Sequence, residues 1–228
     1  AKENNAYPGV KMHRTVSLVN DKKLDKPVVV DVYRVESKDD HQYDLPFYFM
    51  GHFIDANFDY TPYTSQLQKM GDKNGYQHLW KIAEGKPGGN MHFTWLNGER
   101  FYSVISNTDE NSEVIFTMIG ASDPKFNLRN DQGFIIRRKG SSITFVNILQ
   151  PHGIFNPTQE FTIDSYPSIE KIDVLRSDDN YTIVNISGKK NIDWTLAICN
   201  NNPEKNIKHE VTIENKIYKW TGPVQIIK

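Results

Sequence analysis

MHFTWLNGERFYSVI, from Met91 to Ile105, contains two runs rich in aromatic and β-branched residues on either side of an Asn-Gly dipeptide. Asn-Gly between two such runs is the strongest short-range signal for a β-hairpin, because both residues tolerate positive φ angles. The pattern predicts strands at Met91–Leu96 and Arg100–Ile105, joined through Asn97-Gly98-Glu99.

The same alternation of apolar and polar residues continues on both sides of this hairpin. Pro27 introduces a β-branched run, Val28–Val35, that is typical of a central strand. In Val10–Val19 one face of an extended chain carries the apolar set, and Thr15 and Ser17 take the other face. That apolar set consists of Val10, Met12, Val16 and Leu18.

About fifteen short segments in total have strand character and are separated by turn residues at the spacing of antiparallel sheets. Besides those above they include Tyr76–Ala83, Glu113–Ile119, Gly133–Arg138, Ser142–Leu149, Ile169–Leu175, Tyr181–Ile186, Asp193–Ile198, Lys208–Ile213 and Lys216–Trp220. Helical patterning is limited to Thr64–Met70, which could form two turns at most. The sequence therefore predicts an all-β protein, a large antiparallel multi-sheet β-sandwich with under about a tenth of its residues helical. Trp80 and Trp95 are predicted to be buried in its core.

Length and composition are those of one globular unit, with 228 residues, 38% hydrophobic and 24% charged. We expect residues 1–228 to form a single β-sandwich domain, and the abrupt strand-like ends suggest that it is a fragment of a longer chain. The net charge of −1 gives no global attraction to nucleic acid or anionic lipid. No apolar run approaches the roughly 18 residues of a membrane-spanning helix, so no membrane partner is expected. Cys199 is the one cysteine, which excludes an intrachain disulfide.

Standard catalytic motifs for nucleotide, zinc-protease, serine-hydrolase or dithiol chemistry do not occur in the sequence. The seven histidines form no close pair of the kind that binds zinc, so no metal and no cofactor are expected, although ligands from distant strands could still converge. Long turn-rich stretches at Phe58–Gly75 and Ser122–Gln132 are candidate binding loops, because long loops on a β scaffold often carry function.

Two segments combine aromatic rings with histidines, His41–His52 and Gly75–Trp80. In extended chain, His41 and Tyr43 share one face, as do Tyr76 and His78 with Trp80. If these faces converge they could form the wall of a sugar site, because rings stack on sugar C–H faces while phenol and imidazole bind hydroxyls. The alternative is that the same side chains pack two sheets together.

Several segments taken in order resemble the C-terminal β domain of heparinase II/III-like polysaccharide lyases, and most closely the oligoalginate lyases. The resemblance covers about two thirds of the chain, from Asn5 to about Pro157. It is carried by Asn5–Val10, Arg14–Val19, Val28–Val35, His41–Phe47, Gly75–Trp80, Thr94–Gly98, Arg100–Ser103, Gly120–Pro124, Phe126–Arg129 and Pro151–Gly153.

The resemblance implies a parent enzyme in which an N-terminal α/α toroid precedes the β-sandwich, with the active site in the cleft between them. It implies β-elimination on an acidic, uronate-containing polysaccharide or oligosaccharide such as alginate, in the periplasm or outside the cell. In that family the catalytic Asn, His and Tyr and a histidine-rich metal-binding segment precede the part matched here. The catalytic residues are therefore expected outside this chain, which alone should be inactive.

Chemistry within the chain favours the same expectation. A tyrosine base near neutral pH needs a strongly cationic setting, and the nearest cations in sequence, Lys38, Lys73 and Lys81, lie in turn-like or outward positions. Two alternatives remain open: a non-catalytic carbohydrate-binding or structural module, and a β-sandwich adhesion domain that binds another protein.

Overall fold

The computed structural model describes residues 1–120 and 131–228, and in this part of the chain regular structure is almost entirely β. A three-residue 3₁₀ turn, η1 (Tyr76–His78), is the one helical element described. The prediction of an all-β antiparallel sandwich with little helix is confirmed. Across the same residues, no helix is long and apolar enough to cross a membrane. Most of the predicted loop Ser122–Gln132 and of the motifs Gly120–Pro124 and Phe126–Arg129 lies outside the described residues.

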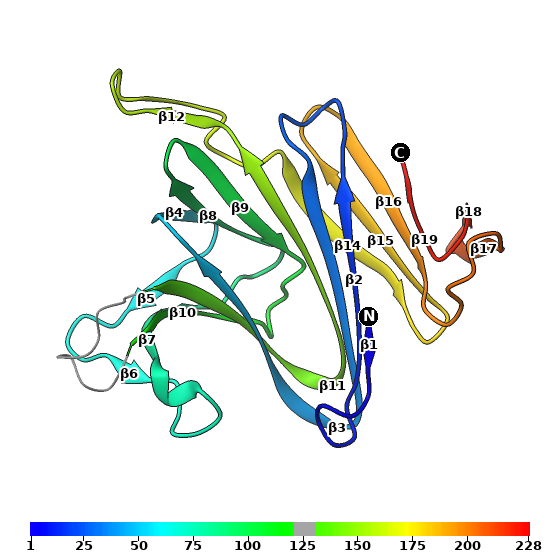
Figure 1. Cartoon of the computed structure of the whole chain (residues 1–228), viewed down its shortest axis with the longest axis horizontal. Helices are drawn as coiled ribbons and strands as arrows, with labels where there is room; N and C mark the ends of the chain where they lie inside the picture. The colour runs from blue at the N-terminus through cyan, green and yellow to red at the C-terminus, as the bar shows by residue number, and fades with distance from the viewer. Residues whose placement is uncertain (121–130) are drawn as a thin grey trace.

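The strands form one large sheet, a four-stranded sheet and two small hairpins, all antiparallel (Figure 1). The large sheet contains β1 (Lys2–Glu3), β2 (Lys11–Val19), β3 (Val28–Phe49), β4 (His52–Ala56), β5 (Tyr60–Pro62), β6 (Gln68–Lys69), β7 (Leu79–Gly85), β8 (Met91–Asn97), β9 (Arg100–Ser106), β10 (Glu113–Ile119) and β11 (Gln132–His152). The four-stranded sheet contains β14 (Ile169–Ser177), β15 (Tyr181–Gly188), β16 (Ile192–Cys199) and β19 (Val224–Ile227). The hairpins are β12 (Ile154–Asn156) with β13 (Phe161–Ile163) and β17 (Lys208–Ile213) with β18 (Lys216–Thr221).

Two long strands, β3 and β11, pair along almost their whole length and form the spine of the molecule. The sequence predicts two separate strands, Gly133–Arg138 and Ser142–Leu149, where β11 is continuous. Gly140 takes a positive φ of 154° at an irregularity where Ser37–Asp40 of β3 face the single residue Ser141. Bulges of this kind bend a strand without ending it. The first half of β11 pairs with β10 and the second half with β9, so the sheet divides into two arms (Figure 1).

Three clusters of buried residues hold the layers together. The first lies between the arms of the large sheet and includes Phe93 and Phe134, whose rings stack at 4.1 Å. The second joins the large sheet to the four-stranded sheet around Trp194. The third lies beneath the β17–β18 hairpin around Trp220. The chain is therefore a layered sandwich, with β17–β18 as a small outer layer (Figure 1).

The hairpin β8–β9 forms where it was predicted, with Asn97 and Arg100 as its last pair. Gly98 has a φ of +61° and Glu99 does not have a positive φ, as in a type II′ turn. Trp95 is buried, as predicted, with 9% of its surface exposed.

The predictions for Tyr76–Ala83 are partly wrong: Tyr76–His78 forms η1 before β7 begins at Leu79, and Trp80 is only partly buried. Gly75, with a φ of +89°, redirects the chain there and breaks the alternation.

A buried histidine ties β11 to β9 and to the base of the β12–β13 hairpin. His152 is 3% exposed; its Nε2 lies 2.8 Å from Ser103 Oγ and its Nδ1 lies 2.8 Å from the backbone oxygen of Asp164. Asp164 O can only accept, so Nδ1–H donates to it and Nε2 of the neutral ring accepts from Ser103. Burial lowers the pKa of His152 below its ordinary value of 6.5.

We expect the stability of the protein to fall as the pH drops below about 6.5. Because the pKa of His152 is lower in the folded state, the unfolded chain binds the proton at higher pH. The stabilisation is complete above the unfolded pKa and is lost as the pH falls through the folded pKa. Urea unfolding at pH 7.5 and pH 5.0 measures this difference. It should shrink in His152→Gln and persist in a control, His41→Gln, on the exposed surface; an unchanged pH dependence in His152→Gln would contradict the assignment.

Candidate functional site

A row of charged side chains crosses the middle strands of one arm of the large sheet. Asp44 on β3 lies directly opposite Arg137 on β11, which in turn lies opposite Glu113 on β10. Arg137 donates from Nε to Asp44 Oδ1 and from Nη2 to Asp44 Oδ2, both at 2.8 Å, and its Nη1 lies 3.5 Å from Glu113 Oε2. The side chains of Asp44 and Arg137 are 8% and 14% exposed, so this is a largely buried bidentate pair.

Tyr76 joins this row from η1. Its hydroxyl donates to Asp44 Oδ2 at 2.5 Å. Burial, and then the hydrogen bond to Asp44, raise the pKa of Tyr76 to about 12, and the nearby Arg137 lowers it less than these effects raise it. The tyrosine is therefore a neutral hydrogen-bond donor at neutral pH and is a poor candidate for a base.

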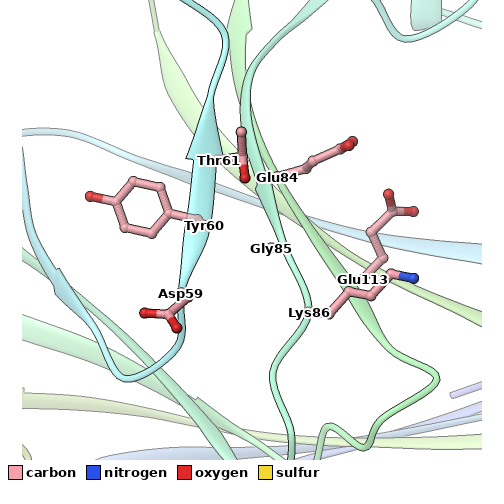
Figure 2. A pocket seen from close by; sticks show the side chains of 7 residues that line it. All are labelled: Asp59, Tyr60, Thr61, Glu84, Gly85, Lys86 and Glu113. Atoms are coloured by element: carbon pink, nitrogen blue, oxygen red, sulfur yellow. The ribbon is translucent and has the colours of Figure 1, made fainter.

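An open depression of about 360 Å³ lies beside this row, at the edge formed by β5, β7 and β10. Figure 2 shows the carboxylates of Glu84 and Glu113 on the same side as Lys86, with Asp59 and Tyr60 on the other side. Burial pushes the pKa of Glu84 upward, but hydrogen bonds from Tyr63 and Lys81, with the charge of Lys81, hold it below its usual value. Glu84 is therefore ionised at neutral pH, which makes the depression a poor site for an acidic sugar.

The structure brings the two predicted aromatic segments together, but from opposite sides of β3. Tyr76 contacts Asp44 on one face, whereas Tyr43 packs against the core between the two arms. Tyr43 donates to Ser37 Oγ at 3.1 Å, and His41 lies edge-on to its ring at 6.1 Å. His78 is exposed, and its backbone oxygen accepts from the Gly120 amide at 3.0 Å. A role for these four residues in lining a substrate stays a prediction.

The cation beside Tyr76 is a residue that the sequence reasoning missed. The cations nearest to the aromatic segments in sequence are Lys38, Lys73 and Lys81, whereas the cation beside Tyr76 is Arg137, which comes from β11. No sequence signal pairs Arg137 with Asp44, because they are 93 positions apart and meet only through the register of two long strands. Since Asp44 already neutralises Arg137, this cation does not turn Tyr76 into a base.

The contact between Ser103 and His152 resembles the nucleophile and base of a hydrolase, but both side chains are buried. Ser103 donates to His152 Nε2 at 2.8 Å and accepts a second hydrogen bond from the Thr94 hydroxyl at 2.6 Å. Ser103 is 0% exposed, so no substrate reaches it. Within residues 1–120 and 131–228, His, Cys, Asp and Glu side chains also form no group of three that could hold a metal ion.

Comparison with known proteins shows that the chain is similar to parts of two alginate lyases. The chain is 33% identical over 219 residues to an alginate lyase from Stenotrophomonas maltophilia, an overlap of 95% of this chain and 29% of that protein. It is 33% identical over 228 residues to an exo-oligoalginate lyase from Saccharophagus degradans, covering 97% of this chain and 31% of that protein. No family model matches the chain.

The chain is related to alginate lyases. The resemblance to oligoalginate lyases read from the sequence motifs is thus confirmed. The alignments with the two alginate lyases cover nearly the whole chain, so the similarity continues beyond Pro157, where the motifs end. The chain spans about 30% of the length of these curated relatives. The wider link to heparinase II/III-like enzymes stays a prediction.

Proposed function

We propose that this chain is the β-sandwich portion of a polysaccharide lyase that cleaves alginate-like oligosaccharides by β-elimination. The observation that carries the proposal is the identity of 33% over nearly the entire chain with two alginate lyases. On this proposal the protein works in the periplasm or outside the cell, and an N-terminal α/α toroid is its partner in the same polypeptide.

The chemistry of the described residues supports a division of labour with other parts of the enzyme. β-Elimination on a uronate needs a base for the C5 proton, an acid for the leaving O4 and cationic or hydrogen-bonding groups for the C6 carboxylate. Here Tyr76 is held neutral, Arg137 is bound by Asp44, and the nearby depression carries Asp59, Glu84 and Glu113. Among the described residues these groups stabilise the fold, and on this proposal the three catalytic tasks fall to residues outside this chain.

A comparison of the 228-residue chain with the complete gene product tests the proposal. We expect the complete protein to produce unsaturated uronate from oligoalginate, followed by ultraviolet absorbance, and the 228-residue chain to produce none above a heat-inactivated control. Turnover by the short chain that is abolished in Tyr76→Phe would contradict the division of labour. Absence of turnover by the complete protein on alginate, heparan sulfate and hyaluronan would contradict the lyase function.

A further inference from the structure

One face of β2 carries apolar side chains that are exposed to solvent. The sequence pattern groups these side chains on the apolar face of the strand, which is normally the buried one. Val16 is 61% exposed and Leu18 is 74% exposed. In an antiparallel sheet with one solvated face, the solvated face is normally polar. On β2 the order is reversed, because Thr15 and Ser17 lie on the opposite face from Val16 and Leu18.

The exposed face is continuous with the core between the two arms of the large sheet. The pairing register places Leu18 opposite Val29, Val29 opposite Leu149, and Leu149 opposite Val104. Exposure falls along this row from 74% at Leu18, through partly buried Val29 and Leu149, to 1% at Val104. The apolar core between the two arms therefore runs out to the surface at β2.

A polar row beside the apolar one is already internally paired. Arg14 donates to both oxygens of Asp31 at 2.7 and 2.9 Å, and Asn147 Nδ2 reaches Asp31 Oδ2 at 3.4 Å. Ser106 donates to Asn147 Oδ1 at 2.8 Å. Because Asp31 neutralises Arg14, this arginine is not a free cation for an acidic sugar, and the exposed side chains beside it are aliphatic instead of aromatic.

The same part of β2 is also an edge of the sheet. Among the described residues, β1 is the neighbour of β2 on that side; it pairs with Met12 and His13, and Ala1 exchanges backbone hydrogen bonds with Arg14 at 2.8 and 2.9 Å. An open edge next to exposed apolar side chains favours association with another polypeptide.

Val16 and Leu18 each present on the order of 100 Å² of apolar surface, far below the ~800 Å² per partner of a stable dimer. A tethered partner needs less area, because the tether raises its effective concentration.

We propose that the face of β2 formed by Val16 and Leu18 is the docking surface for the polypeptide that, in the complete enzyme, lies outside these 228 residues. The inference rests on the proposed function, since the two relatives are about three times as long as the part that this chain matches. The partner segment is apolar, covers Val16 and Leu18, and closes the open end of the core.

Cysteine accessibility tests this docking surface directly. Leu18→Cys is introduced into the 228-residue chain and into the complete gene product, and labelling by a maleimide is timed. The 228-residue chain is a suitable background for this labelling because its native cysteine, Cys199, is buried. The matched control is Ile217→Cys on β18, which is 54% exposed and lies on the far hairpin (Figure 1). We expect labelling at position 18 to be on the order of 100-fold slower in the complete protein, and labelling at position 217 to be equal in both.

Equal labelling at position 18 in the two proteins would overturn the proposal, as would equal protection of positions 18 and 217. Protection in the short chain that rises with its concentration would assign the surface to a second copy instead. A gene encoding nothing beyond these residues would also overturn it. Oligoalginate turnover by the same complete Leu18→Cys protein separates the two proposals: rapid labelling with turnover refutes the docking surface alone, and protection without turnover refutes the lyase function alone.

Discussion

Replacement of Asp44 by alanine is expected to lower the free energy of unfolding by about 3 kcal/mol or more. The change leaves the guanidinium of Arg137, 14% exposed, without its carboxylate partner at 2.8 Å; Glu113 at 3.5 Å and the side-chain amide oxygen of Gln42 at 3.1 Å remain. It also removes the acceptor of the Tyr76 hydroxyl, which is then partly buried without its bond. Guanidinium or urea unfolding followed by intrinsic fluorescence measures the loss.

Two control variants distinguish the cost of breaking a buried ion pair from the cost of removing any charged side chain. Asp173→Ala removes one partner of the Lys171–Asp173 pair, whose side chains are 61% and 37% exposed, and should cost under about 1 kcal/mol. The double variant Asp44→Leu/Arg137→Met removes both buried charges and should recover most of the loss. If Asp44→Ala costs no more than Asp173→Ala, the pair does not stabilise the fold.

Truncation of Trp95 to alanine is expected to cost about 3–5 kcal/mol. The indole is 9% exposed, stacks on Tyr102 at 5.7 Å and lies 5.3 Å from the ring of Phe49. Its removal leaves a cavity between β8 and β3, and rings held on three strands cannot all move to fill it. The midpoint of urea unfolding should fall without a change of slope, which indicates that the fold itself is kept.

The comparison variant is Trp80→Ala on β7. Trp80 is only partly buried and has Lys69 Nζ 5.6 Å from its ring, so we expect a loss of about 1–2 kcal/mol. A cost for Trp95→Ala that does not exceed the cost for Trp80→Ala would show that burial at β8 does not contribute as the structure implies.

The candidate site shows where sequence reasoning reached its limit. Tyr76 was identified from the clustering of aromatic and histidine residues, which is a local signal. Its partners Asp44 and Arg137 were not identified, because an ion pair between two strands depends on their register. Even the strand assigned to Tyr76 was wrong, since the positive φ of Gly75 starts a 3₁₀ turn there.

The sequence by itself determined the all-β class, the β8–β9 hairpin and the relationship to oligoalginate lyases. These features depend on alternation, turn residues and motif order, which are properties of neighbouring residues. Only the tertiary structure decided that β11 continues through Gly140, that Arg137 meets Asp44, and that Val16 and Leu18 remain exposed. The physical reason is that alternation states which residues share a face of a strand, whereas the packing of distant segments decides which face is covered.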